Sequence, residues 1–155
     1  IMSKVDKYVA LIPRIQSVLS GETDEIARMS NMAALLHFEF GSSGQGSIAS
    51  FRLMNCARAI PGTCSLQQDK EGQGSLRHFM EEERTLVVPD VEQFPGHIVC
   101  SSESRSEIVV PCRKSGQIVA VLDIDSKELA AFDEVDKEYL EQIVSMLYGE
   151  ECHME

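Results

Sequence analysis

The predicted elements follow an order that indicates an α+β fold, with helices on one face of an antiparallel sheet. Two helical patterns open the chain, β-branched runs typical of a hairpin lie in the second half, and one more helical pattern follows them. Strands gathered between terminal helices are typical of layered α+β domains. With 155 residues the chain has the size of one domain and can bury a core. We therefore expect a single domain over residues 1–155.

The two N-terminal helices are predicted from hydrophobic spacing. Over residues 5–19 apolar side chains recur with a period near that of a helix, at Val5, Tyr8, Val9, Leu11, Ile12, Ile15, Val18 and Leu19. Residues 22–38 repeat the pattern through Ile26, Met29, Ala33 and Leu36, and acidic residues in the first turn suit the helix dipole. Because the link is short, we expect an antiparallel helix pair.

The middle of the chain is harder to interpret. Residues 47–54 are predicted to form a strand, although the alternation of apolar and polar residues is poor. Residues 55–74 contain glycine, proline and a long polar run, which indicates mostly loop. Residues 75–83 are predicted as a short helix, and residues 86–88 as a strand that stops at the following Pro-Asp.

The second half carries clearer signals. Residues 106–111 and 117–124 are β-branched runs joined by Arg-Lys-Ser-Gly, which predicts a β-hairpin. Asp133 then suits the N-cap of a last helix, with Asp136 three residues on. The apolar face of that helix is predicted to hold Val135, Tyr139, Leu140, Ile143 and Leu147.

Charge and cysteine content exclude several classes of function. The net charge is −11, from 14 basic and 25 acidic residues, and this field would repel nucleic acid and an anionic membrane. We see neither a membrane-length apolar run nor a signal-peptide core near the start, so we expect the reducing cytoplasm. The five cysteines form no CxxC pair, which argues against structural zinc, and the size of the chain and a reducing compartment argue against a disulfide framework.

One cysteine and three carboxylates suggest chemistry. Cys100 lies in a loop rich in Ser, Gly and Pro, and Glu107 begins the strand that follows. Asp123 and Asp125 are two apart in a strand and share a face. Negative neighbours disfavour a thiolate, which argues against acyl transfer. Carboxylates can instead hold a substrate ammonium group and protonate a departing oxygen, and an amino-acid sulfoxide needs both. Attack on sulfur would leave a sulfenic acid on the cysteine, and a second cysteine would condense with it to a disulfide.

The same segment resembles a known family. The runs VPDV, FPGHI with its cysteine, SRSEIVVP and VLDIDS, all within residues 88–126, match in order and without a gap. They resemble the signature of the free methionine-(R)-sulfoxide reductases, which are single GAF-domain enzymes. The N-terminal runs GET and NMAALLHFEF also resemble helices of that family.

The resemblance implies a function and a site. Cys100 would be the attacking cysteine, and Glu107, Asp123 and Asp125 would line the ligand pocket, bind the amino group and supply the proton. The fold would be a GAF domain with the terminal helices on one face of the sheet and pocket loops on the other. The substrate would be free methionine sulfoxide, the reductant thioredoxin-like and the assembly a homodimer. We expect no cofactor and no metal.

The resemblance fails in the middle of the chain. The family strand expected near residues 48–54 carries a Trp at the pocket wall, and this chain has no Trp. One family cysteine is replaced by Leu76, and the resolving cysteine could be Cys64 or Cys56. These departures favour an alternative, a catalytically weakened GAF module that binds a small amino-acid-like ligand.

The remaining candidates are assigned structural roles. We expect Cys112 to pack in the core and Cys152 to be inert, and we expect Ser104 and Arg105 to shape the loop of the attacking cysteine. His97 is expected to pack in or orient that loop, not to act as a base.

Overall fold

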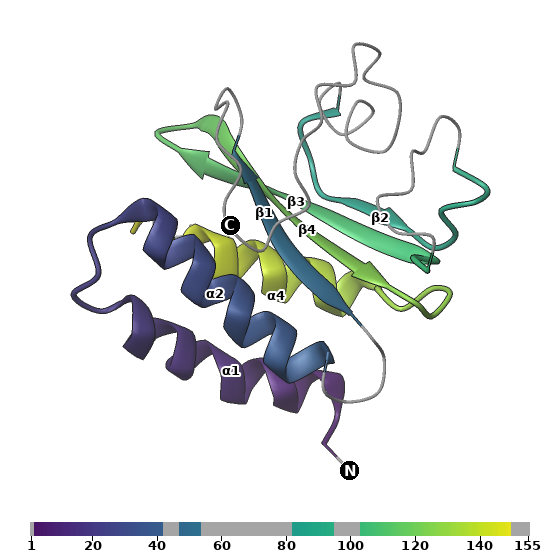
Figure 1. Ribbon diagram of the computed structural model, residues 1–155, viewed down its shortest axis with the longest axis horizontal. Coiled ribbons are helices and arrows are strands. Elements are labelled where there is room, and N and C mark those ends of the chain that lie inside the picture. Colours follow the sequence, from purple (N-terminus) through teal and green to yellow (C-terminus); the bar gives the residue numbers. More distant parts are fainter. Residues whose placement is uncertain (1, 42–46, 54–81, 95–102, 150–155) are drawn as a thin grey trace.

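The computed structural model describes residues 2–41, 47–53, 82–94 and 103–149. Its elements are α1 (Lys4–Leu19), α2 (Glu25–Phe40), β1 (Ile48–Leu53), β2 (Leu86–Val88), β3 (Ser106–Lys114), β4 (Gln117–Ser126) and α4 (Glu134–Ser145). The strands form one antiparallel sheet in the order β1-β4-β3-β2, and α1, α2 and α4 lie together on one side of it (Figure 1). The expected α+β class and helix placement are confirmed. The loop predicted over residues 55–74, and nearly all of the helix predicted over residues 75–83, lie outside the described residues.

Local capping decides where the N-terminal helices begin. The side chain of Ser3 accepts a hydrogen bond from the amide of Asp6, and the Asp6 carboxylate accepts one from the amide of Ser3, so α1 starts one residue before its predicted position. In α2 the Asp24 carboxylate accepts from the amide of Ala27 at 2.8 Å, which delays the start to Glu25. Part of the predicted face of α2 was wrong, because Ile26 is 39% exposed and Met32 is buried instead.

The predicted hairpin is present and is longer than the sequence suggested. Lys114 pairs with Gln117, so the connection contains only Ser115 and Gly116. Both loop residues have positive φ, 52° and 78°. Two-residue loops of this kind match the twist of antiparallel strands. The strand pairing therefore includes Arg113 and Lys114, which were predicted to belong to the turn.

Strands β3 and β4 separate their side chains onto two faces. The helix-covered face carries buried apolar residues that join one core cluster with the helices: Ile108, Val110, Cys112, Ala120, Leu122 and Ile124. On the other face Val109 and Val121 pack with Leu86 and Ile118 in a smaller cluster. Successive residues of a strand point to opposite faces, so the acidic residues at the ends of β3 and β4 lie on the face away from the helices.

Among the polar contacts that join the helices, two lie at opposite ends and involve groups withdrawn from solvent. The guanidinium of Arg28 donates to the carbonyls of Leu19 and Glu22 at 2.7 Å and to those of Met146 and Leu147 at 2.9 Å. It thereby bonds carbonyl groups at the end of α1 and after α4, where the regular helical hydrogen bonds stop.

The second contact is a buried group at the other end of the helices. Asp136 is 2% exposed; it accepts a hydrogen bond from the Tyr8 hydroxyl at 2.8 Å and pairs with Lys4 at 2.6 Å. The ring of Tyr8 stacks on Tyr139 with centroids 5.0 Å apart. The predicted cap of α4 is confirmed, since Asp133 accepts from the amides of Val135 and Asp136.

Candidate functional site

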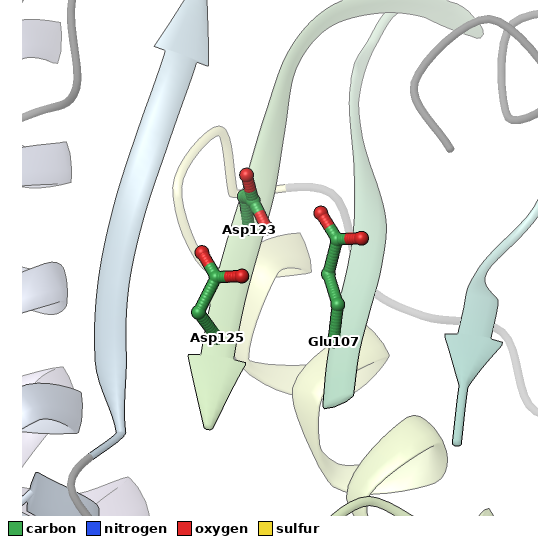
Figure 2. A group of neighbouring side chains, drawn as sticks. All are labelled: Glu107, Asp123 and Asp125. Atoms are coloured by element: carbon green, nitrogen blue, oxygen red, sulfur yellow. The ribbon is translucent and has the colours of Figure 1, made fainter. Parts of the chain in front are cut away.

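The structure brings the three predicted carboxylates together. Glu107 stands directly opposite Asp125 across β3 and β4, and Val109 stands opposite Asp123. Oxygens of Glu107, Asp123 and Asp125 lie within 4.8 Å of one another. Figure 2 shows the three side chains converging from two adjacent strands onto one face of the sheet. We call these three residues the acidic cluster.

The acidic cluster is largely withdrawn from solvent. Glu107 is 5% exposed and Asp123 is 2% exposed, while Asp125 is half-buried. Their surroundings on this face include the buried side chains of Val88, which is opposite Glu107, and Val109. Carboxylates this close repel one another, and a proton or a cation relieves that repulsion. The cluster is thus suited to receive a cationic group, to hold a proton, or to do both in sequence.

A serine touches the cluster. Ser104 is 8% exposed, and its hydroxyl donates to Oδ1 of Asp125 at 2.6 Å. From the sequence, Ser104 was expected only to shape the loop of Cys100. Its contact with Asp125 was missed because the two residues are 21 positions apart.

The edge strand β1 contributes a polar residue that the sequence analysis also missed. Ser50 is 7% exposed and stands opposite Asp123, so both side chains lie on the same face. The available signal was a serine directly before Phe51, because a strand residue next to an apolar core residue points to the opposite face of the sheet. Apolar and polar residues alternate poorly along β1, so the face on which Ser50 lies was not predicted.

Hydrogen bonds hold the β4–α4 loop next to the acidic cluster. The buried hydroxyl of Ser106 donates to the carbonyl of Glu128 at 2.6 Å and accepts from the amide of Ala131 at 3.3 Å. The amide of Ala130, which has a φ of 48°, donates to the carbonyl of Pro89 at 2.9 Å. These bonds connect the β4–α4 loop to the start of β3 and the end of β2.

Of the cysteines, the structure describes Cys112. It is fully buried on the helix-covered face, and burial raises the pKa of its thiol to about 12. The expected core role is confirmed, because a thiol that seldom ionises is a poor nucleophile. The other four, Cys56, Cys64, Cys100 and Cys152, lie outside the described residues, as does His97.

The cluster also has the donor set of a metal site. Within the described ranges, Glu107, Asp123 and Asp125 are the one group of acidic, histidine or cysteine side chains close enough to share an ion. Carboxylate oxygens are ligands for hard cations such as Mg²⁺ or Ca²⁺. An alkylammonium group carries positive charge and three N–H donors, and so satisfies the same oxygens.

The fold and site define a GAF domain: the GAF domain family matches residues 14–148. The chain is 41% identical over 150 residues to GAF domain-containing protein A of Dictyostelium discoideum, covering 94% of this chain and 92% of the relative. It is 30% identical over 150 residues to the free methionine-R-sulfoxide reductase of Escherichia coli, covering 94% and 89%. The structure of the Neisseria meningitidis free methionine-R-sulfoxide reductase in complex with its substrate superimposes with a TM-score of 0.79, at 34% identity over 96% of this chain and 90% of that one. The chain belongs to the free methionine-R-sulfoxide reductase family of GAF domain proteins.

This membership confirms the resemblance, the expected GAF fold and the expected enzyme class. The roles of individual residues, the reductant and the dimer stay predictions. No helix among the described residues is long and apolar enough to cross a membrane.

Proposed function

We propose that the chain reduces free L-methionine-(R)-sulfoxide to methionine. The observation that carries the proposal is the acidic cluster, three carboxylate groups within 4.8 Å on one face of the sheet. The relatives named free methionine-R-sulfoxide reductase, and the Neisseria meningitidis structure described as a complex with its substrate, support the substrate class.

The cluster supplies two functions that this substrate needs. A free amino acid carries an ammonium group, which Glu107, Asp123 and Asp125 together can bind by charge and by hydrogen bonds. A sulfoxide oxygen needs a proton as it leaves sulfur, and a buried carboxylic acid can donate one. A sulfoxide within a peptide lacks the ammonium group, which gives the preference for the free amino acid a physical cause.

The redox step uses Cys100. Its sulfur attacks the sulfoxide sulfur, the S–O bond of the substrate breaks with protonation of the oxygen, and that oxygen ends on the cysteine as a sulfenic acid. Thiol and sulfoxide thus become sulfenic acid and thioether. The sulfoxide gains two electrons, and the cysteine loses them.

A second cysteine then resolves the sulfenic acid. The thiol of Cys64 or Cys56 condenses with the sulfenic acid, which releases water and forms a disulfide. A thioredoxin-like protein then reduces the disulfide. The enzyme is a single domain over residues 1–155, works as a homodimer in the cytoplasm, and uses no metal or cofactor.

A second candidate function is binding without efficient turnover. The absence of Trp from the whole chain favours it, because the family places a Trp at the pocket wall. A GAF module of this kind would hold a small amino-acid-like ligand through the same acidic cluster.

A coupled assay tests the proposal. We expect turnover of free methionine-(R)-sulfoxide, and none of the (S) epimer or of a peptide-bound sulfoxide, with dithiothreitol and with thioredoxin as reductants. Cys100→Ser should abolish it. Cys112→Ala is the matched control and should keep the activity of the folded fraction, because Cys112 is buried on the helix-covered face. Turnover with dithiothreitol alone would contradict the resolving step.

Thiol counting separates the two candidates. After treatment with free methionine-(R)-sulfoxide and no reductant, the enzyme should lose two free thiols per chain, whereas a binding module would lose none. Full activity in Cys100→Ser would overturn the assignment of the attacking cysteine.

A further inference from the structure

The hydroxyl of Ser104 makes a short contact with the acidic cluster. It donates to Oδ1 of Asp125 at 2.6 Å, which lies in the range of charge-assisted O–H···O⁻ bonds. Ser104 is 8% exposed, so water competes little for the bond. Such bonds are stronger and more directional than those between neutral groups.

The backbone around Ser104 is held by the sheet. The amide of Arg105 donates to the carbonyl of Ser126 at 2.8 Å, and the carbonyl of Arg105 accepts from the amide of Val91 at 3.0 Å. Ser104 therefore approaches Asp125 from a segment bonded both to the end of β4 and to the residues after β2. The sheet thus holds the backbone next to the residue that carries the hydroxyl.

Asp125 is the member of the acidic cluster that most needs such support. It lies next to the last residue of β4 and is half-buried, whereas Glu107 and Asp123 are 5% and 2% exposed. Negative charge on those two carboxylates disfavours a third carboxylate beside them, and Asp125 is the member with the most access to solvent. Across from it on β1 stands Ile48, an apolar residue that is 50% exposed. Figure 2 shows Asp125 nearest the end of its strand.

We propose that Ser104 is a positioning residue of this site: its hydroxyl holds the Asp125 carboxylate against Glu107 and Asp123, so that all three meet the ammonium group of the ligand together. The inference rests on the proposed function, since it assumes a ligand with an ammonium group. Ser104 acts through Asp125 and has no role at the reacting sulfur. Its loss weakens ground-state and transition-state binding alike, which raises KM and leaves kcat nearly unchanged.

The test compares three serine variants in the full chain. Ser104→Ala should raise KM for free methionine-(R)-sulfoxide about tenfold, with kcat within about twofold of wild type. Ser104→Thr keeps the hydroxyl and should restore KM. Ser106→Ala is the control, because it removes another buried hydroxyl, one that bonds the β4–α4 loop and not the acidic cluster. It should lower Tm and leave KM in place.

A double-mutant cycle adds a readout that a purely structural role would not move. Calorimetry would give the Kd of free methionine, the product that keeps the ammonium group. In the Asp125→Asn background, Ser104→Ala should weaken binding by less than about twofold, because the partner that Ser104 orients is already altered.

The possible outcomes are distinct. An unchanged KM and Kd in Ser104→Ala, or an equal rise in Ser106→Ala, would overturn this inference and leave the proposed function intact. If wild type binds methionine without turnover, the enzyme proposal fails, and the Kd values still test whether Ser104 positions Asp125. If wild type neither binds nor turns over, both fall.

Discussion

Strands β3 and β4 carry the main apolar core on one face and the acidic cluster, beside a smaller apolar cluster, on the other. On the helix-covered face Ile108, Val110, Leu122 and Ile124 are buried in one apolar cluster. On the other face Glu107, Asp123 and Asp125 gather within 4.8 Å. Apolar burial favours folding by about 25 cal/mol per Å² of surface removed from water. Withdrawing like charges from water disfavours folding.

The contrast indicates that one face of the sheet contributes stability and the other contributes function. The helix-covered face supplies stability and supports the acidic cluster from behind, since each acid alternates with a core residue. The cluster face carries groups whose repulsion a folded protein would not keep for stability alone. Substitutions on the two faces should therefore separate activity from stability.

The largest effect is expected on the cluster face. Glu107→Gln and Asp123→Asn should each lower kcat/KM about a thousandfold, because each removes a group that binds the ammonium or moves a proton. Their Tm should equal or exceed that of wild type, because repulsion in the cluster is relieved. Steady-state kinetics and thermal unfolding measure both. A large fall in Tm with activity retained would reverse our assignment of the two faces.

The next effect is expected on the helix-covered face. Leu122 is fully buried on the helix-covered face, next to Asp123 in β4. Leu122→Ala should lower the free energy of unfolding by about 3 kcal/mol, because apolar burial is lost and a cavity is left. Activity per folded molecule should stay near wild type. Urea unfolding gives the value, and Ile48→Ala, at a half-exposed position on β1, serves as the control with little change.

A smaller effect is expected where the helices that cover the sheet are joined. Arg28→Met should cost about 2 kcal/mol, because the carbonyls of Leu19, Glu22, Met146 and Leu147 lose the hydrogen bonds from the guanidinium. The loss should be smaller than for Leu122→Ala, since those carbonyls can reach water. Chemical denaturation measures it, and a cost equal to or above that of Leu122→Ala would show that this junction outweighs the core.

The smallest effect has a pH signature. Burial opposes the charge on Lys4, but hydrogen bonds to Asp136 and Asp133 outweigh it and raise the pKa of Lys4. The hydrogen bond from Lys4 lowers the pKa of Asp133. Lys4→Gln should cost about 1 kcal/mol near neutral pH, a modest figure because Lys4 and Asp133 are 33% and 57% exposed and solvent screens that pair, while the buried Asp136 keeps its hydrogen bond from Tyr8.

The sign of that dependence follows from the two shifts. A lowered carboxyl pKa stabilises the fold above the carboxyl range and ceases to do so as the pH falls through it. A raised lysine pKa stabilises the fold below the lysine range, and that contribution is lost as the pH rises past about 10. The difference in unfolding free energy between wild type and Lys4→Gln should thus be greatest near neutrality and shrink at both extremes. A difference that is flat with pH would exclude the ion pair as its source.

Local patterns in the sequence determined the class of fold and much of the site. Alternation in the two β-branched runs was sufficient to predict the hairpin and to place Asp123 and Asp125 on one face. Hydrophobic spacing predicted the helices, because an amphipathic face must be buried for a helix of this length to be stable. The family motif around Glu107 and Asp123 indicated the enzyme class before any geometry was known.

Only the tertiary structure decided how distant residues meet. It placed Glu107 opposite Asp125, bonded Ser104 to Asp125, and buried Asp136 against Tyr8, which is 128 positions away. Strand register and helix packing set these contacts, and both arise from the cooperation of many side chains across the chain. Local propensity depends on neighbours within a turn or two, so it carries no information about a partner so far along the sequence.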